Sequence, residues 1–363
     1  MQKSLYSEFV ERNFPQLVVA ISETLNGRSM TSQIPFLFRS MLTPTYSPDS
    51  RWQSISAKYT DVAADIIALG APTPLKGRDS INSYVGEIPK FGVMRSLNEV
   101  QMKDIDNMIA QKRPDQEIIN RIFNDVPFVI NAVDEGIEDL FLAMLSTGVG
   151  MKTNNVSQAV RFDMHYTDFV DNHRGVATLW ANDAAKPIND IQKIVDQSEM
   201  DGNVIINCYA DDTALRALFE NEQVRAYFGF QQSYTGGVDN IPTLSLQQLQ
   251  TLFQNQWGIN LVRVRRTTRT EVNGVRNPHK AWANGRMVFT CDERIGDLVY
   301  TATAEETRQA SDVIYQKAND YTLVSKFSEQ EPLMEYTKSQ AMVCPVLMNV
   351  NRIYSLDTLT VQA

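Results

Sequence analysis

The spacing of apolar residues changes several times along the chain, and each change predicts a different element. Between Leu17 and Leu25 apolar residues recur at helical spacing, and Asn26-Gly27 follows as a stop signal. We expect a short helix here, after an irregular lead that contains Phe14-Pro15.

Residues 33–95 have an extended character. Residues 33–50 hold three prolines and the apolar group Phe36-Leu37-Phe38, which favours extended chain with a surface that needs a partner. Strand-like runs at Trp52–Tyr59 and 62–69 then lead to a return from Ile81 to Val93. This predicts a long hairpin. Two strands alone leave one face and both edges unburied, so we expect the hairpin to pack on something else.

A long helix follows the hairpin. Apolar residues recur at helical spacing from Ile118 to Leu145, and Gly148 and Gly150 end the run. Pro127 lacks a backbone donor and clashes with the preceding turn, so it should kink this spine helix or divide it in two.

A pair of strands is expected after the spine helix. Strict alternation of apolar and polar residues over 160–167 predicts a half-buried strand, which a turn at 171–175 joins to a returning strand at 176–180. An extended segment, Ala341–Leu347, is expected to lie beside this hairpin near the end of the chain.

The middle third alternates helices with strands. A helix begins at Pro187, a second surrounds Leu215, and a third carries Leu246–Phe253. Strands are expected at Val204–Tyr209 and Leu261–Arg265. This order predicts a compact α/β unit.

Composition is that of a folded protein. The chain has 363 residues, of which 43% are apolar and 21% charged, so it can bury a sizeable core. The formal net charge of −9 argues against a surface whose main task is gripping nucleic acid phosphates. Three widely spaced cysteines suit neither a disulfide scaffold nor a zinc site, and a reducing compartment fits them.

No targeting segment or membrane span is expected. The apolar stretch Leu17–Ile21 is five residues long, which is too short for the core of a signal peptide. No apolar run elsewhere approaches the length that crosses a bilayer.

Candidate chemistry is sparse. Asp163, His165 and Asp168 form the best metal candidate, but they lie on the polar face of a strand without a recognised ligand spacing, so we interpret them as a solvated face. Cys208 lies on an apolar strand, where burial raises the pKa of a thiol and leaves little thiolate. We therefore expect Cys208 to serve packing.

Charged pairs and runs can also be interpreted as structural or as functional. Asp211-Asp212 and Asp292-Glu293 follow strands, and we favour capping and turn roles over acid/base chemistry. The basic run of Arg263, Arg265, Arg266 and Arg269 could contact a neighbouring acidic surface. Nucleic acid contact is the alternative, but the run lacks aromatic residues for base stacking. No phosphate-binding glycine loop or nucleophile elbow occurs, so we expect no enzyme activity, cofactor or metal.

The order of elements, together with three phrases, resembles the major capsid protein of tailed bacteriophages, with the lambda-type E coat protein family nearest. The phrases are Tyr-Val-Gly-Glu-Ile-Pro-Lys-Phe-Gly at 84–92, Phe162-Asp163 through Trp180 to Pro187–Ile191, and Cys344-Pro345 through Arg352. The resemblance covers nearly the whole chain.

The resemblance implies an α+β chain with the Hong Kong 97-type phage capsid fold. It implies an N-terminal arm at 1–47 and an extended loop (E-loop) hairpin at 48–95. A peripheral domain with the spine helix would take 96–184 and 306–363, and an α/β axial domain would take 185–305. In that family the axial domain packs around five-fold and six-fold axes and the hairpin lies over the next subunit.

The resemblance also implies a function. The chain would assemble with itself, as pentamers and hexamers, into the icosahedral or elongated shell of a double-stranded DNA phage or prophage, in the cytoplasm of a bacterial host. It would enclose DNA without reading its sequence, and its other partners would be portal, scaffold and decoration proteins. Alternatives are an encapsulin-like cellular compartment and an α/β enzyme or ligand-binding domain. The residues expected to contact neighbouring subunits are Phe36, Phe38, Trp52, Tyr59, Tyr84 and Phe91.

Overall fold

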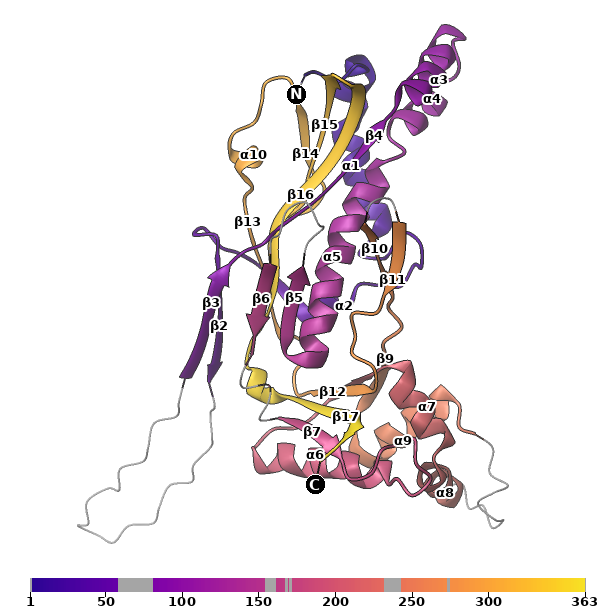
Figure 1. Cartoon of the computed structure of the whole chain (residues 1–363), viewed down its shortest axis with the longest axis vertical. Coiled ribbons are helices and arrows are strands. Elements are labelled where there is room, and N and C mark those ends of the chain that lie inside the picture. The colour runs from indigo at the N-terminus through magenta and orange to yellow at the C-terminus, as the bar shows by residue number, and fades with distance from the viewer. Residues whose placement is uncertain are drawn as a thin grey trace, which may run out of the picture. The chain divides into compact units, whose positions relative to one another are not determined.

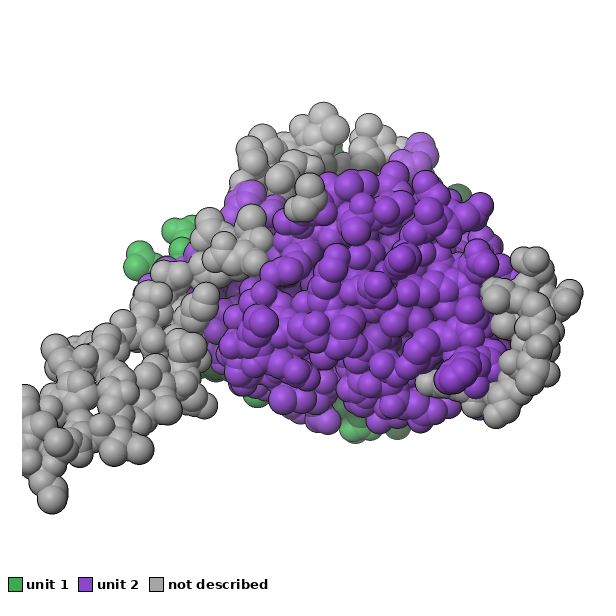
Figure 2. Space-filling view, turned by 90° about the horizontal axis from the view of Figure 1, so that it is seen from below, with its two compact units in different colours: residues 1–52, 85–139, 297–346 green, residues 53–84, 140–296, 347–363 purple. Residues whose placement is uncertain are grey.

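The chain folds into two compact units, which Figure 2 colours separately. The computed structural model describes residues 2–57, 81–153, 161–166, 169, 172–231, 243–272 and 275–362. Unit 1 holds residues 1–52, 85–139 and 297–346, and unit 2 holds 53–84, 140–296 and 347–363. The divisions fall inside five elements, which therefore continue from one unit into the other: α5, β2, β3, β13 and β16.

Unit 1 combines helices with a six-stranded sheet (Figure 1). Its helices are α1 (Ser7–Leu25), α2 (Leu37–Met41), α3 (Glu99–Ala110), α4 (Asp115–Ile122), the first part of α5 (Val126–Thr147) and α10 (Ala304–Thr307). Its strands are β1 (Leu42–Tyr46), β4 (Lys90–Leu97), β13 (Gly296–Thr301), β14 (Ile314–Lys317), β15 (Leu323–Gln330) and β16 (Leu333–Leu347).

Strand β16 organises the sheet of unit 1. The strand order is β1-β13-β16-β15-β14, and β4 also pairs with β16. β15 and β4 both run antiparallel to β16. An apolar core forms between α1, α3, α4 and α5, where Phe14, Ile105 and Val126 are fully buried. Unit 1 therefore has a core of its own.

Unit 2 contains the α/β part of the chain. Its helices are the rest of α5, α6 (Pro187–Met200), α7 (Asp212–Glu220), α8 (Glu222–Gln231), α9 (Leu246–Trp257) and a 3-10 turn at Val350–Arg352. Its strands are β5 (Val149–Thr153), β6 (Arg161–His165), β7 (His173–Val176), β8 (Asn207–Ala210), β9 (Asn260–Arg263), β10 (Thr268–Val272), β11 (Val275–His279), β12 (Arg286–Thr290) and β17 (Ile353–Val361). The hairpin strands β2 (Arg51–Ala57) and β3 (Ile81–Glu87) pair with each other.

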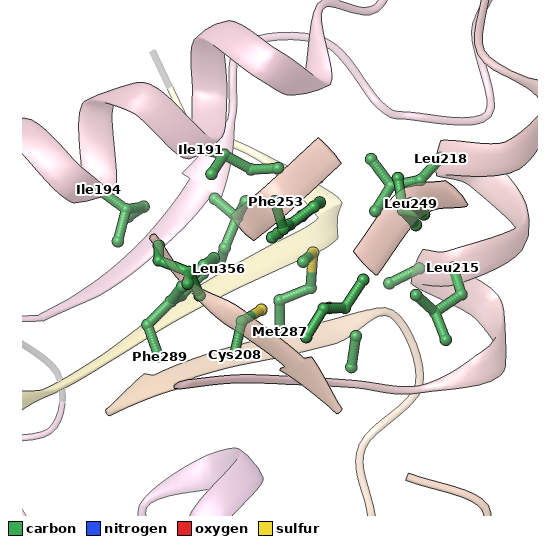
Figure 3. Packing of buried hydrophobic residues seen from close by; sticks show 14 of the residues in the cluster. Ile191, Ile194, Cys208, Leu215, Leu218, Leu249, Phe253, Met287, Phe289 and Leu356 are labelled. Carbon is green, nitrogen blue, oxygen red and sulfur yellow. The ribbon is translucent and has the colours of Figure 1, made fainter. Parts of the chain in front are cut away.

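A five-stranded mixed sheet forms the centre of unit 2, in the order β7-β17-β12-β8-β9. The outer pairs β17–β7 and β8–β9 are parallel, and the two inner pairs are antiparallel. Figure 3 shows side chains from the sheet, including Cys208, Phe289 and Leu356, packed against side chains of the helices. These buried side chains make up the core of unit 2.

Local sequence signals explain several helix ends. Asn98 and Gln101 form a capping box at the start of α3, and Ser245 and Gln248 form one at α9. Gly258 ends α9 with φ of 70°, a left-handed conformation that glycine adopts without strain. Within the described residues, every helix is too short or too polar to cross a lipid bilayer.

The expected division of the spine helix is confirmed. α4 ends at Ile122 and α5 begins at Val126, so Pro127 lies in the first turn of α5, where its missing N–H costs no helical hydrogen bond. The expected irregular lead at Phe14-Pro15 is wrong, because α1 begins at Ser7 and continues through Pro15. Complete burial of Val10, Phe14 and Val18 outweighs the lost hydrogen bond.

Two strand pairings also differ from the prediction. β6 pairs antiparallel with β5, and β7 pairs parallel with β17, so residues 160–180 do not form the expected hairpin. Ala341 and Met342 of β16 pair with Phe91 and Lys90 of β4. The end of β16 does reach the predicted neighbour, because Leu347 donates its N–H to the Tyr166 hydroxyl at 2.9 Å. Alternation fixes which face of a strand is buried, but it does not specify the partner strand.

Candidate intersubunit surfaces

Residues 27–41 lie within unit 1, where α5 holds them. Phe36 and Phe38 are 2% and 0% exposed, and their rings lie 5.7 Å apart. The buried Glu138 carboxylate accepts the backbone N–H of Leu37 at 2.9 Å and that of Phe38 at 3.0 Å. These donors belong to the first turn of α2 and have no partner inside that helix. Glu138 therefore caps α2 from another helix.

The same face of α5 makes three more polar contacts with this segment. Asn131 accepts the N–H of Met30 at 3.0 Å, and Ser29 donates to Glu135 at 2.8 Å. Arg39 Nη2 lies 2.7 Å from Asp134 Oδ2, and the other oxygen of Asp134 accepts a hydrogen bond from the Tyr321 hydroxyl at 2.8 Å. Burial raises the pKa of Asp134 although Arg39 opposes the shift.

These four acceptors stand at helical spacing i, i+3, i+4 and i+7, so they line one face of α5. We call Asn131, Asp134, Glu135 and Glu138 the polar stripe. It fixes residues 29–39 by hydrogen bonds and one ion pair.

The first residues of the chain are held by a buried ion pair. The Glu335 carboxylate accepts the Ser4 hydroxyl and, at 3.1 Å, the N–H of Leu5. Lys326 Nζ lies 3.9 Å from Glu335 and donates to the carbonyl of Ile122 at 3.1 Å. Burial raises the pKa of Glu335 and lowers that of Lys326. The N-terminus is thus fastened to β15 and β16.

The base of the predicted hairpin is present as β2 paired with β3. Trp52 is 5% exposed, and its indole N–H has no hydrogen-bond partner within the described residues. The ring packs on Gly86 so closely that a Cβ added there would lie 2.7 Å from it. Gly86 is therefore required for Trp52 to occupy this position.

Tyr84 and Phe91 keep part of their surface exposed. Tyr84 is half-buried and packs edge to face on Tyr166, with ring centroids 5.4 Å apart. Phe91 is half-buried on β4, and a Cβ added at Gly136 would lie 3.0 Å from its ring. Each ring therefore has one covered face within the chain.

Comparison with known proteins decides the fold. Neither a protein-family model nor a curated protein matches the sequence. A structure provisionally described as a prophage capsid protein of Escherichia coli CFT073 covers 98% of this chain and 99% of its own, with a TM-score of 0.55 and 12% identity. A phage-related protein from Bordetella bronchiseptica RB50 covers 95% and 98%, with a TM-score of 0.50 and 11% identity.

The chain has the Hong Kong 97-type capsid fold. The expected fold class is confirmed. The match runs along nearly the whole of both chains, so the capsid fold accounts for unit 1 and unit 2 alike.

Within this capsid fold, three predicted contact residues need a different explanation. Phe36, Phe38 and Trp52 are buried in the chain itself, so no neighbour is required to cover them. The expected extended conformation of Phe36-Leu37-Phe38 is also wrong, because Leu37 begins α2. Tyr59 lies outside the described residues. Contact of Tyr84 and Phe91 with a neighbour stays a prediction.

Exposed apolar residues near the hairpin were not singled out by the sequence. Val85 is 58% exposed and Met94 is 51% exposed. On β4, half-buried and exposed residues alternate from Lys90 to Ser96, which places Met94 on the outward face. The alternation was the signal that could have identified Met94, once the buried face was known.

The structure shows the surroundings of several chemical groups that the sequence singled out. Burial raises the pKa of Cys208 well above its ordinary value, which agrees with a packing role. Asp211 caps α7 by accepting the N–H groups of Thr213 and Ala214, as expected. His165 is exposed, while the side chain of Asp163 and all of Asp168 lie outside the described residues. The described residues contain no group of three metal-binding side chains.

Proposed function

We propose that the chain is the major capsid protein of a tailed double-stranded DNA phage or prophage, and that copies of it form pentamers and hexamers in a closed shell. The observation that carries this proposal is the likeness along nearly the full length of both chains to the prophage structure described as a capsid protein. A shell subunit needs interlocking surfaces rather than a catalytic site. Among the candidate catalytic groups, Cys208 is buried and Asp211 caps α7, which are structural roles.

The proposal assigns each range of residues to one part of the capsid subunit. Residues 1–47 form the N-terminal arm, 48–95 the extended loop, 96–184 with 306–363 the peripheral domain, and 185–305 the axial domain. The extended loop lies over the next subunit, where Tyr84 and Phe91 meet it. Their half-buried rings and the exposed apolar Val85 and Met94 support this part of the proposal.

The proposed partners follow from the function. The shell is located in the virion and encloses double-stranded DNA without reading its sequence. A net charge of −9 supports an enclosing role over tight phosphate binding. Portal, scaffold and decoration proteins are the other proposed partners.

Sedimentation of the purified chain across a concentration series tests the proposal. Many modest contacts repeated over closed symmetry make assembly steeply dependent on concentration. We expect subunits at low concentration and large closed particles above a threshold. A chain that stays monomeric at every concentration would contradict the proposal. Extracted double-stranded DNA supports the phage shell, whereas a packaged enzyme would instead indicate a cellular compartment.

A further inference from the structure

Strands β10 and β11 form a two-stranded ribbon whose sides are not paired with other described strands. Their antiparallel register places Thr268 opposite His279 and Val272 opposite Val275. All five residues of β11 are exposed. The ribbon is a separate sheet from the five-stranded sheet of unit 2.

The ribbon has no apolar face that could stabilise it. On one face Arg269 and Glu271 stand opposite Pro278 and Arg276. On the other face Thr268 and Thr270 stand opposite His279 and Asn277, and the only apolar pair, Val272 with Val275, ends the ribbon. Thr268 is buried, so the exposed part of this face begins at Thr270. Two strands with no apolar face and two open edges are marginally stable alone in water. The ribbon is therefore suited to contact with a partner.

The residues just before and after the ribbon, which we call its root, are held in unit 2 by Arg263 and Trp282. Arg263 at the end of β9 forms an ion pair with Asp212 of α7. Arg263 also donates a hydrogen bond to Asp212, and this bond lowers the pKa of Asp212, with smaller contributions from Lys280 and Arg265. Trp282 is buried and donates its indole N–H to the carbonyl of Arg286 at 3.1 Å. Two carboxylates lie beside these residues: Asp212 is engaged by Arg263, and Asp211 accepts backbone N–H groups of α7 and of Gly285.

Positive charge concentrates in this segment of an acidic protein. Residues 263–280 contain six Arg or Lys and one Glu, a net charge of +5, so the remaining residues carry −14 within the total of −9. Arg276 pairs with Glu271 at 2.8 Å. Arg265 and Arg269 are exposed and make no ion pair within the described ranges. These two cations and the exposed Lys280 are therefore available to a partner.

We propose that the β10–β11 ribbon docks on an acidic surface of a second copy of the same chain and draws subunits together. This inference rests on the proposed shell function and names the contact partner of one segment. Subunits that each carry −9 repel one another. The exposed cations Arg265 and Arg269 convert that repulsion into local attraction where they meet acidic residues of the second copy. The ribbon contains no aromatic residue on which a base could stack, so a protein partner fits it better than nucleic acid.

Charge reversal on the purified full chain tests the inference. The variant Arg265→Glu/Arg269→Glu changes two exposed side chains. Arg269 stands opposite Pro278 across the ribbon, whereas Arg265 acts on Asp212, so the thermal unfolding measurement checks the cost of the Glu at position 265. We expect its assembly rate, followed by light scattering, to fall by about ten-fold or more. Arg265→Gln/Arg269→Gln should fall between this variant and the native chain. The difference should shrink in high salt, because the Debye length drops from about 10 Å at 0.1 M to about 3 Å at 1 M.

A matched control separates the ribbon from net charge. Lys103→Glu/Lys112→Glu makes the same change in formal charge at exposed positions in and just after α3. Circular dichroism and thermal unfolding establish that every variant is folded. We expect the control to assemble at nearly the native rate. An equally slow control would overturn the inference, since net charge would then explain the effect.

The remaining outcomes are distinct. Native-rate assembly of Arg265→Glu/Arg269→Glu would overturn the ribbon contact and leave the shell function standing. Native-rate assembly combined with lost retention of a double-stranded DNA fragment would assign the ribbon to nucleic acid and also overturn the inference. Failure of the native chain to form shells under any condition would remove the proposed function together with this contact.

Discussion

A single carboxylate, Glu138, connects two segments that lie about a hundred residues apart in the sequence. It accepts two N–H groups at the start of α2 while it is 1% exposed. A buried carboxylate without such donors would be costly, and the α2 donors would lack partners without the carboxylate. The two groups therefore satisfy each other.

Glu138→Gln should destabilise the chain. The amide keeps one acceptor oxygen but places an NH₂ group against a backbone donor, and a hydrogen bond to a charged group contributes about 1.5–3 kcal/mol. We expect the free energy of unfolding to fall by about 2 kcal/mol, measured in a denaturant titration. Glu23→Gln on the exposed side of α1 is the control and should change it little. Equal stability of the two variants would refute the capping role.

Gly86→Ala should disturb the base of the hairpin. The added Cβ would lie 2.7 Å from the buried Trp52 ring, and overpacking of this kind costs about 1–3 kcal/mol. Gly92→Ala is the matched control, because its Cβ would meet its nearest neighbour at an ordinary 3.5 Å. Thermal unfolding with tryptophan fluorescence compares the two. A Gly86→Ala protein as stable as the control would show that Trp52 can move away freely.

At the scale of elements, the hairpin β2–β3 is the segment most directly tied to assembly by the proposed function. β2 ends at Ala57, β3 begins at Ile81 and the two strands pair with each other, so we expect a short linker to join them. Replacing residues 58–80 with a Gly-Ser turn preserves the buried Trp52 and the β4–β16 pairing.

This replacement should give a folded subunit that forms no closed shells. The two cores of the chain lie outside the replaced segment, whereas the proposed overlap with the next subunit is lost. Circular dichroism should show native helix content, and sedimentation should show only small species. Closed particles from the shortened chain would contradict the proposed role of the extended loop.

The sequence predicted elements better than it predicted their partners. Pro127 indicated the division between α4 and α5, and Asn26-Gly27 correctly marked the end of α1. The predicted partner of β6 was wrong, because β6 pairs with β5 and not with the 176–180 segment. Both segments lie near β6 in the sequence, and alternation does not choose between them. Helix α3 was not predicted at all, since only Met102 and Ile105 of its residues are buried.

The predicted contact residues show the same limit. Phe36, Phe38 and Trp52 were assigned to neighbours because their local sequence offered no burial partner. In the structure Glu138 accepts the backbone N–H of Phe38, and the Trp52 ring packs on Gly86. No local pattern links those positions. Tyr84 and Phe91 remain candidates because the chain covers only part of each ring.

For the whole molecule, the proposed shell requires a balance of repulsion and contact between acidic subunits. A net charge of −9 makes such subunits repel one another. The surfaces that we propose to favour association are the basic β10–β11 ribbon and exposed apolar residues such as Val85 and Met94. Each contact need only be modest, since closed symmetry repeats it many times.

Electron microscopy of the purified native chain tests the central claim most directly. The account predicts closed particles of uniform size whose symmetric reconstruction shows pentamers and hexamers of this fold. Monomers or small irregular oligomers at high protein concentration, with no closed shell, would contradict it.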